Sequence, residues 1–393
     1  MQPPRLAPLD VLRFFAIFFV LLRHVPGTWP WAFRFGWSGV DLFFVLSGFL
    51  VTGLLFGERR KRGRADVTRF LVRRAFKIYP SFWALVAATA VFFAATGEHA
   101  RLTQWACELL FLQNYGPSIW SHTWSLAVEE HFYLLLALGF AGWQRRASRA
   151  LAPAPASPIP PPRDEAPTPA ARRALLLAGA AALTTILASR CLTVLLVPAR
   201  YKLVYMGTHV RVDGLLCGAL IASLYHTDGA WLRATVRRHR LPLLGVTALA
   251  ALPAFVLGLD HAFTRTLGFT FVYLFYGAVL LATLFAADAD DSAEPVGSTG
   301  SASFAGSASF AARPRPLVGA LAFVGRYSYG IYLWHPLAND LTGRLLGPAL
   351  AAWPFAVRLA LYLVASIVPG VVLSRLIEEP FLALRDRLFP RRA

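Results

Sequence analysis

The chain has 393 residues, of which 56% are hydrophobic and 15% are charged. An ordinary soluble domain carries about 25% charged residues, so this composition excludes a soluble globular fold and indicates a helical membrane protein. The net charge of +18 would also suit nucleic-acid binding, but the basic residues lie in the links between apolar runs. That is the positive-inside pattern. We therefore predict no nucleic-acid partner and attribute the charge to topology and contact with anionic lipid.

The apolar runs predict about ten transmembrane helices, since each is long enough to cross the hydrocarbon core. The basic links share one side if both termini are cytoplasmic. Arg5 and the apolar stretch after it resemble a signal peptide, but no small-residue cleavage site follows, so we expect a retained first span. The fold class is thus all-α and polytopic, with spans expected at 8–26, 37–57, 76–97, 123–143, 173–197, 206–226, 241–259, 263–287, 317–339 and 353–377.

The whole chain, 1–393, is expected to form a single membrane domain. Two links, 148–171 and 288–316, are rich in Pro and Ala or in Ser, Gly and Ala. They lack core-forming residues, so we expect disordered cytoplasmic linkers there. The three cysteines are scattered and provide neither a disulfide framework nor a metal-ligand spacing, so we predict no metal site.

Span one contains two ionisable residues, Arg13 and His24. They are eleven residues apart, close to three helical turns, so both lie on one face and about 16 Å apart along the axis. Ionisable groups inside a span are costly and usually functional. The alternative is an Arg that extends to the inner interface and a His at the outer one.

Span two opens with GWSGVDLFFVLSGFL and places Asp41 near its outer end, at the level of His24. Its small residues Gly39, Ser47 and Gly48 indicate close packing against another helix. Asp41 is a candidate substrate-binding or structural polar residue.

The stretch before span three, RFLVRRAFKIYP, gathers Arg73, Arg74 and Lys77 at the cytoplasmic membrane edge. Such a cluster sets topology and binds lipid headgroups. It is also suited to hold a phosphate-bearing molecule, because guanidinium groups bind phosphates bidentately. Glu378 and Glu379 end span ten on the same side and would counter this positive charge.

Span four, within HTWSLAVEEHFYLLLAL, places Glu129 and Glu130 at a depth similar to that of His24. A carboxylate beside an imidazole fixes its tautomer and raises its basicity. That pair would suit a general base acting on a hydroxyl group. The alternative is a structural ion pair between a glutamate and an arginine.

Spans six and nine hold further polar residues. Arg211 and Asp213 would pair with each other or with another span, in a structural or substrate-gating role. His335 lies near the outer end of span nine among aromatic residues typical of a membrane interface. An H-x4-D spacing joins His335 to Asp340, a pattern that some lipid acyltransferases use but that also arises by chance.

Taken together, these blocks resemble the acyltransferase 3 family of membrane O-acyltransferases. The matching stretches occur in family order and cover nearly the whole chain: LDVLRFFAIFFVLLRH, GVDLFFVLSGFL, RRAFKIYP, TWSLAVEEHFYL, RVDGLLCGAL, GRYSYGIYLWHPL and EEPF. The resemblance implies transfer of an acyl group, often acetyl, from acyl-CoA to a hydroxyl of a polysaccharide, lipopolysaccharide, peptidoglycan or macrolide sugar. It implies no tightly bound cofactor, and a location in the cytoplasmic membrane of a bacterium.

The resemblance also assigns residues. The family's Arg-x10-His pattern falls on Arg13 and His24, which would be catalytic, and its acidic position falls on Glu129 or Glu130. Its R-x-x-R pattern falls on Arg74 and Lys77, where lysine replaces the usual arginine and loses bidentate geometry. Arg73 is expected to compensate. His131 stands where many members carry Gln, and the SGNH-type esterase-like domain that some members append is not seen.

These expectations form one mechanism. Acyl-CoA would bind at the cytoplasmic face through Arg73, Arg74 and Lys77, and its pantetheine arm would pass Arg13. His24 would act as general base or carry the acyl group. A rival interpretation is a proton-coupled transporter of a small polar or acylated solute, although no internal repeat supports it. A third is a pseudo-enzyme that binds acyl groups without turnover.

Overall fold

A computed structural model of the chain describes residues 7–25, 35–150, 168–286, 316–350 and 352–389. Over these ranges the protein consists of helices and the links between them, with no strand. Six helical stretches within the ranges are long and apolar enough to cross a membrane. The all-α class is confirmed for these residues and fits a multi-pass membrane protein. The ten-span count and the side of the termini stay predictions.

The first half of the chain forms α1 to α6, and each of the first four predicted spans contains a long helix. The bounds are α1 Ala7–Arg23, α3 Gly39–Arg62, α4 Val67–Thr96, α5 Leu102–Leu109, a short 3-10 turn Ser121–Thr123, and α6 Trp124–Ala150.

The second half forms the remaining helices, two of which include a π-helical turn. The bounds are α7 Pro169–Leu196, α8 Tyr201–Tyr205, α9 Thr208–Arg211, α10 Asp213–Thr227, α11 Gly229–Leu257, a π turn Thr264–Gly268, α12 Phe269–Leu284, α13 Pro316–Arg326, α14 Ser328–Leu350, α15 Phe355–Leu373, a π turn Ser374–Glu378, and α16 Glu379–Leu388.

The predicted linkers lie largely outside the described residues. Helix α6 continues to Ala150 and α7 begins at Pro169 with Thr168 as its N-cap, so the helical part extends into the predicted 148–171 linker from both ends. Pro at the first helical position and a Thr cap favour this start. Most of 288–316 is likewise not described, and α13 begins at Pro316.

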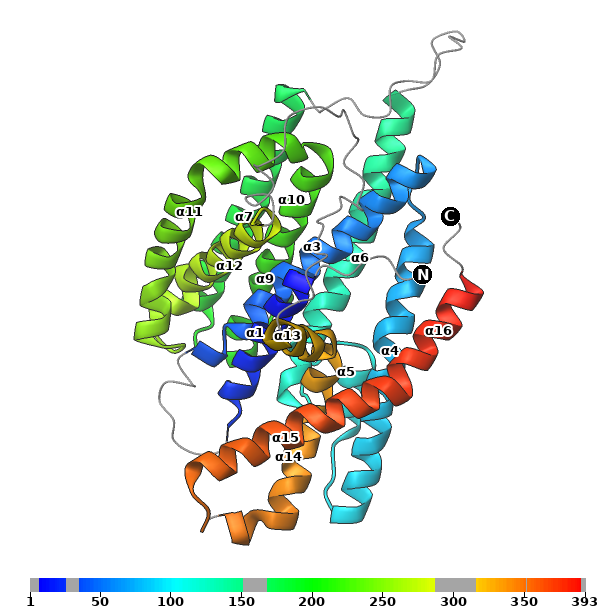
Figure 1. The fold of residues 1–393 in the computed structure, drawn as a ribbon, viewed down its shortest axis with the longest axis vertical. Helices are drawn as coiled ribbons and strands as arrows, with labels where there is room; N and C mark the ends of the chain where they lie inside the picture. Colours follow the sequence, from blue (N-terminus) through cyan, green and yellow to red (C-terminus); the bar gives the residue numbers. More distant parts are fainter. Residues whose placement is uncertain (1–6, 26–34, 151–167, 287–315, 351, 390–393) are drawn as a thin grey trace.

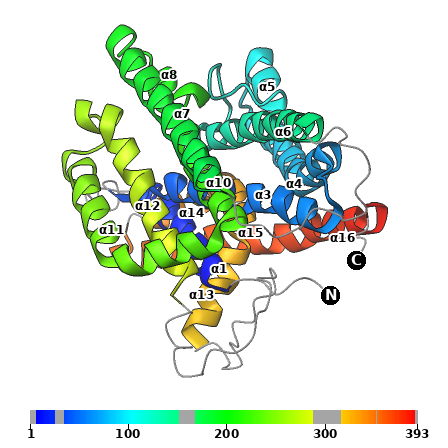
Figure 2. The same ribbon diagram turned by 90° about the horizontal axis from the view of Figure 1, so that it is seen from above.

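Helix α3 runs through the middle of the bundle, with α7, α11 and α12 on one side and α4, α5 and α6 on the other (Figures 1 and 2). It packs most extensively against α10. A Cβ atom at Gly48 would overlap the carbonyl of Leu215, and one at Gly218 would overlap the carbonyl of Val45. The expected close packing at Gly48 is confirmed, and it explains why the two helices approach so closely.

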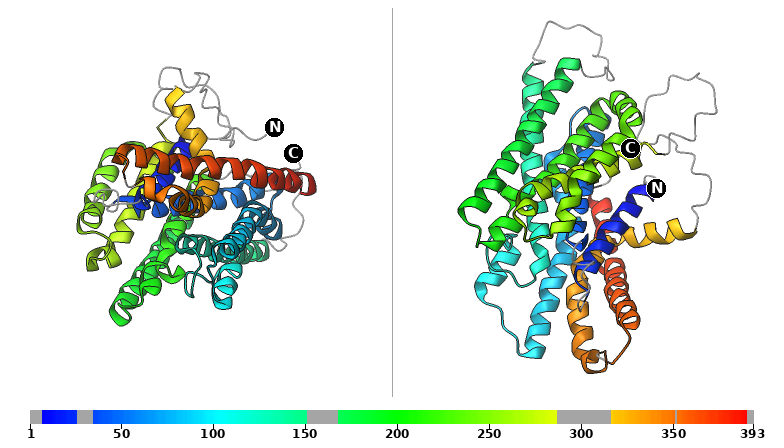
Figure 3. Two further views of the ribbon diagram at one scale, coloured as in Figure 1. Left: turned by 90° about the horizontal axis from the view of Figure 1, so that it is seen from below. Right: turned by 90° about the vertical axis from the view of Figure 1, so that its left-hand side faces the viewer.

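Predicted span nine is two helices rather than one. The chain breaks at Tyr327 between α13 and α14, and Figure 3 shows α13 running across the molecule while α14 follows its length. Helix α13 instead lies against α1, where a Cβ atom at Gly325 would overlap the carbonyl of Asp10. This close contact pulls 316–326 out of line with 328–350, which hydropathy alone does not reveal.

Large apolar side chains remain exposed on the outward faces of the long helices. On α11, Leu241 is 80% exposed and Leu249 is 71% exposed, and on α6 Leu138 is 71% exposed. Contiguous apolar surface of this kind marks contact with another apolar phase. In a chain of this composition that phase is lipid, and the polar groups described below are correspondingly turned inward.

Candidate active site

A cavity of about 140 Å³ lies inside the bundle between α1, α3, α4, α6 and α14. Of the four charged residues that line the cavity, three are basic and one is acidic. The cavity therefore favours an anionic or electron-rich ligand. The polar lining residues are Arg13, Ser47, Arg74, Lys77, Ser125, Glu129, Ser328, Tyr329 and Tyr332, and the rest are apolar.

Arg74 is held in the cavity by a chain of hydrogen bonds to α6. Its Nη2 donates to the hydroxyl of Tyr133 at 2.8 Å, and that hydroxyl in turn donates to Glu129. Ser47 of α3 contacts the same hydroxyl at 2.9 Å. Tyr133 and Glu129 lie four residues apart on α6, so they share a face. These hydrogen bonds fix the Arg74 guanidinium at the cavity wall, and no carboxylate among the described residues contacts the guanidinium directly.

The other two basic groups are fixed from different helices. Arg13 Nε on α1 donates to the hydroxyl of Ser328, the first residue of α14, at 3.2 Å. Lys77 forms an ion pair with Glu378, which confirms the expected counter-charge from the end of the last span. The Lys77 ammonium also lies 5.5 Å from the ring centre of Tyr329.

Arg73 is turned away from this cavity. It donates to the carboxylate of Asp386 at 2.9 Å and to the carbonyl of Phe389 at 2.8 Å, both at the C-terminal end of the described chain. Successive helical residues point about 100° apart, which is why neighbouring arginines have different partners. The predicted three-residue cradle is therefore divided, and Arg73 is not positioned to compensate for Lys77.

The expected pairing of His24 with a glutamate is not formed. His24 donates from Nδ1 to the carbonyl of Val20 at 2.9 Å, and its ring centre lies 5.0 Å from that of His335. Glu129 accepts from Tyr133, and Glu130 accepts from Tyr79 at 3.0 Å. The similar depth inferred from sequence does not place these groups side by side, because they lie on different faces of the packed helices.

His335 contacts two other histidines instead of Asp340. It is fully buried, and its ring centre lies 5.4 Å from that of His122. Asp340 binds Arg344 at 3.1 Å on the exposed side of α14, so the H-x4-D pair is not formed. His122 was overlooked in the sequence, although it opens the same block as Glu129, and its depth would have identified it.

His122 is positioned by a buried carboxylate in the segment between α4 and α6. Glu108 of α5 accepts hydrogen bonds from the hydroxyl of Thr123 and from the main-chain N–H groups of Ile119 and Trp120. Burial raises the pKa of Glu108 above its ordinary value, and these hydrogen bonds oppose that rise. The turn that carries His122 is thus fixed on both sides of the histidine.

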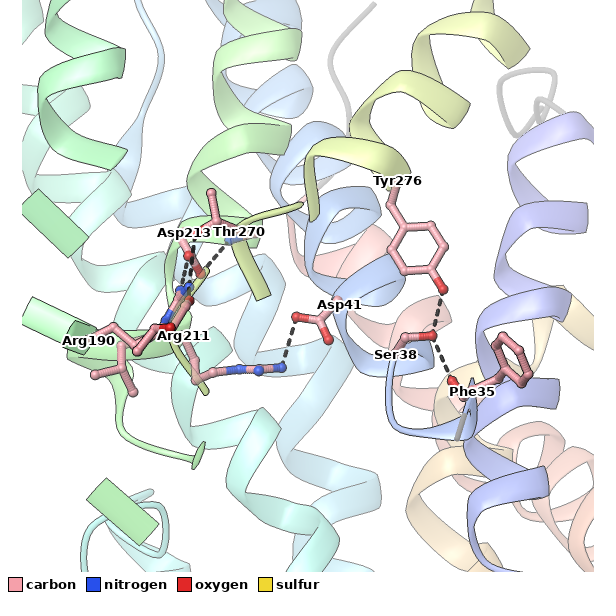
Figure 4. A network of polar contacts seen from close by, with 11 residues as sticks. Phe35, Ser38, Asp41, Arg190, Arg211, Asp213, Thr270 and Tyr276 are labelled. Atoms are coloured by element: carbon pink, nitrogen blue, oxygen red, sulfur yellow. Dashed lines mark hydrogen bonds and ion pairs between the residues drawn. The ribbon is translucent and has the colours of Figure 1, made fainter. Parts of the chain in front are cut away.

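A second polar group lies on the other side of α3, and Figure 4 shows its residues. Asp41 binds Arg211 at 2.8 Å, and Asp213 binds Arg190. Of the two predicted alternatives for Arg211 and Asp213, pairing with other spans is the one observed. Arg190, missed in the sequence, is a lone charge in an apolar span, which is itself a signal.

These four side chains are at most 5% exposed and do not line the cavity. Arg190 is further bound by the carbonyls of Val210 and Thr266, and the Arg211 guanidinium lies 3.8 Å from the ring centre of Phe269. Two cations and two anions cancel, so the group ties α3, α7, α9 and α10 together.

The fold and site together define an α-helical membrane protein with a basic internal cavity. The model of the acyltransferase 3 family, described as an acyltransferase domain, matches residues 6–375. The chain therefore belongs to the acyltransferase 3 family. The resemblance recognised in the sequence, and the enzyme class that it implied, are confirmed at the level of the family.

Two relatives give the family context. The chain is 25% identical over 398 residues to the peptidoglycan O-acetyltransferase OatA of Listeria monocytogenes, covering 95% of this chain and 55% of the relative. It is 30% identical over 155 residues to the O-acetyltransferase OatA of Staphylococcus aureus, covering 35% of this chain and 25% of the relative. The chain thus spans about half the length of the Listeria monocytogenes relative. The match to the Staphylococcus aureus relative spans a quarter of that protein's length. No solved structure matches it significantly.

Proposed function

We propose that this chain is a membrane O-acyltransferase that moves an acyl group, in the first instance acetyl, from acyl-CoA to a hydroxyl of a carbohydrate acceptor. The observation that carries the proposal is the cavity in which Arg13, Arg74, Lys77 and Glu129 converge from three helices. All four lie in the sequence blocks that match the family. The relatives named above act, by their names, as O-acetyltransferases.

The donor is accommodated by the basic wall of the cavity. Arg74 is oriented by Tyr133 and presents its charge to the interior, and Lys77 lies one turn further along α4. Guanidinium and ammonium groups bind phosphate oxygens strongly. We assign the phosphates of acyl-CoA to Arg74 and Lys77, and the pantetheine arm to the apolar interior that leads past Arg13. Arg73 has no part in this assignment.

The chemistry is assigned to His24. The thioester C–S bond breaks, an ester C–O bond forms, and the proton of the acceptor hydroxyl ends on the sulfur of CoA. His24 acts as general base on that hydroxyl, or carries the acyl group between the two substrates. Glu129 acts at a distance, because it holds Tyr133 and through it Arg74.

For the acceptor we propose peptidoglycan first, because the Listeria monocytogenes relative covers 95% of this chain and is named for that substrate. A glycosylated metabolite or another surface polysaccharide is the alternative. Both offer the same chemical group, a sugar hydroxyl, so the site chemistry does not separate them.

The test uses the full chain reconstituted in proteoliposomes with acetyl-CoA and muropeptide oligosaccharides. We expect release of CoA thiol together with a mass increase of one acetyl group on the acceptor. Arg74→Ala should raise the KM for acetyl-CoA by roughly tenfold or more, since one charge-assisted contact is worth about 1.5–3 kcal/mol. The matched control is Arg73→Ala, whose side chain binds Asp386 and should leave that KM within twofold.

Other outcomes separate the rival functions. Uptake of a solute into the proteoliposomes without acyl modification would identify a transporter. Binding of acetyl-CoA without release of thiol in the presence of every acceptor tested would identify a protein that only binds acyl groups. Equal effects of the two arginine substitutions would refute the proposed donor site.

A further inference from the structure

Three histidines from distant parts of the chain meet outside the set of residues that line the cavity. His335 of α14 lies between His24, at the end of α1, and His122, in the turn before α6. His335 and His122 are buried, and His24 is exposed. Tyr332 and Ser125 line the cavity, and their hydroxyls contact each other at 2.6 Å.

Main-chain contacts fix the tautomers of all three rings. His24 Nδ1 faces the carbonyl of Val20, His335 Nδ1 faces that of Tyr332 at 2.8 Å, and His122 Nε2 faces that of Leu333 at 3.2 Å. A carbonyl only accepts, so each of these nitrogens carries a hydrogen. In the neutral rings the second nitrogen of each imidazole is therefore a bare acceptor.

Two of these bare nitrogens have no hydrogen-bond partner. They are His335 Nε2 and His122 Nδ1, and both are buried. An unsatisfied buried acceptor costs about 1–3 kcal/mol, and a single added proton would supply the missing donor. Ring centres separated by 5.0 and 5.4 Å allow direct N–H···N contact when two bare nitrogens face each other. The geometry therefore allows a proton delivered to the group to be shared between neighbouring rings.

We propose that His122 and His335 are positioning residues that share with His24 the proton removed from the acceptor hydroxyl. This inference rests on the proposed function. The hydroxyl loses its proton to His24 as the ester bond forms, and the proton is held among the three imidazoles. It then passes to the CoA thiolate released by cleavage of the thioester. Tyr332 connects the cavity with the three histidines. Its hydroxyl contacts Ser125 at the cavity and donates to the carbonyl of His122 at 2.7 Å.

The alternative use of three histidines is a metal site. Among the described residues no group of three or more His, Cys, Asp and Glu side chains is arranged to hold a metal ion. The exposure of His24 next to two buried rings also suits a base that meets its substrate from one side and delivers a proton inward.

The test removes single bare nitrogens while keeping the structural contacts. His335→Asn retains an N–H near the position of Nδ1 for the Tyr332 carbonyl, and His122→Gln retains one near the position of Nε2 for the Leu333 carbonyl. We expect each variant to lower kcat by about 10- to 100-fold, which is at or below the lower end of the range for loss of a general base, because His24 is retained. KM values and the melting temperature should stay near wild type. The solvent deuterium isotope effect on kcat should rise, because proton transfer becomes slower.

His226→Asn is the matched control, since His226 is a partly buried histidine stacked on Phe56 and is not among the residues that line the cavity. It should leave kcat unchanged. Wild-type kcat in His335→Asn and His122→Gln, with transfer by the wild type intact, overturns the inference and leaves the proposed function standing. A fall in kcat that comes only with a lower melting temperature and a raised KM assigns a structural role and also overturns it. A wild type that transfers no acyl group overturns both.

Discussion

Two groups of buried charges lie on opposite sides of α3, and they are built in different ways. In the ion-pair group each cation has an anion: Arg190 with Asp213, and Arg211 with Asp41. In the cavity three basic side chains line the wall with a single acid, Glu129. Arg13 and Arg74 bind hydroxyl groups, and Lys77 pairs with Glu378, which is not a lining residue.

The difference lies in how the charges are partnered, and it is the basis on which we propose a structural role for one group and a functional role for the other. In the ion-pair group the charges balance, and the pairs join helices that are distant in the sequence. A cavity wall on which basic side chains outnumber acidic ones favours an anionic ligand. The same residue types in one bundle thus have opposite consequences when they are substituted. Four predictions test that contrast.

The largest effect on catalysis is expected at His24. His24→Ala removes the proposed general base, so kcat for acyl transfer should fall by about 10²- to 10⁴-fold. The melting temperature in detergent should change little, because the side chain is exposed. The measurement is the rate of thiol release by the full chain in proteoliposomes. Wild-type turnover in this variant would contradict the assignment of the chemistry.

The largest effect on stability is expected in the ion-pair group. Asp213→Ala leaves Arg190, which is 0% exposed, without its counter-ion. Breaking a buried pair in this way costs about 3–5 kcal/mol, so the thermal unfolding transition should shift strongly downward. The double variant Arg190→Met with Asp213→Leu should recover most of that loss. If the single and double variants are equally destabilised, charge pairing is not what holds these helices together.

A smaller effect should distinguish the adjacent glutamates. Glu129→Ala releases Tyr133 and with it Arg74, so the KM for acetyl-CoA should rise by about tenfold. Glu130→Ala removes an acceptor for Tyr79 outside the cavity wall and should change that KM by less than about twofold. Steady-state kinetics of the two variants gives the comparison. The reverse order would place the functional acid at Glu130.

The smallest effect is expected for a charge at the surface. Arg344 binds Asp340 and Glu98, and the three side chains are 40–44% exposed. Exposed pairs contribute about 0–1 kcal/mol, so Arg344→Ala should leave both kcat and the unfolding transition nearly unchanged. A large loss of activity would revive the H-x4-D interpretation of His335 and Asp340.

Much of the site was predictable residue by residue but not pair by pair. Arg13, Arg74, Lys77 and Glu129 were all identified in the sequence, because charges in or beside apolar spans are rare. Their partners were not. Arg73 and Arg74 are neighbours in the chain, and only the packing of α4 decides that one meets Asp386 and the other Tyr133. The same applies to Arg211 and Asp213, which flank a break at Val212 and bind different helices.

The amino-acid sequence by itself determined the helical membrane class, the family and the residues in question, since hydropathy and motif blocks are local properties of the chain. Only the tertiary structure decided which residues meet. In the structure His24 lies beside His335 rather than beside a glutamate, and His122 lies beside His335 as well. The basic cluster is divided between the cavity, which Arg74 and Lys77 line, and the C-terminal end, which Arg73 contacts. The physical reason is that helix faces meet through packing across long sequence separations, and depth along a helix does not specify the rotation about its axis.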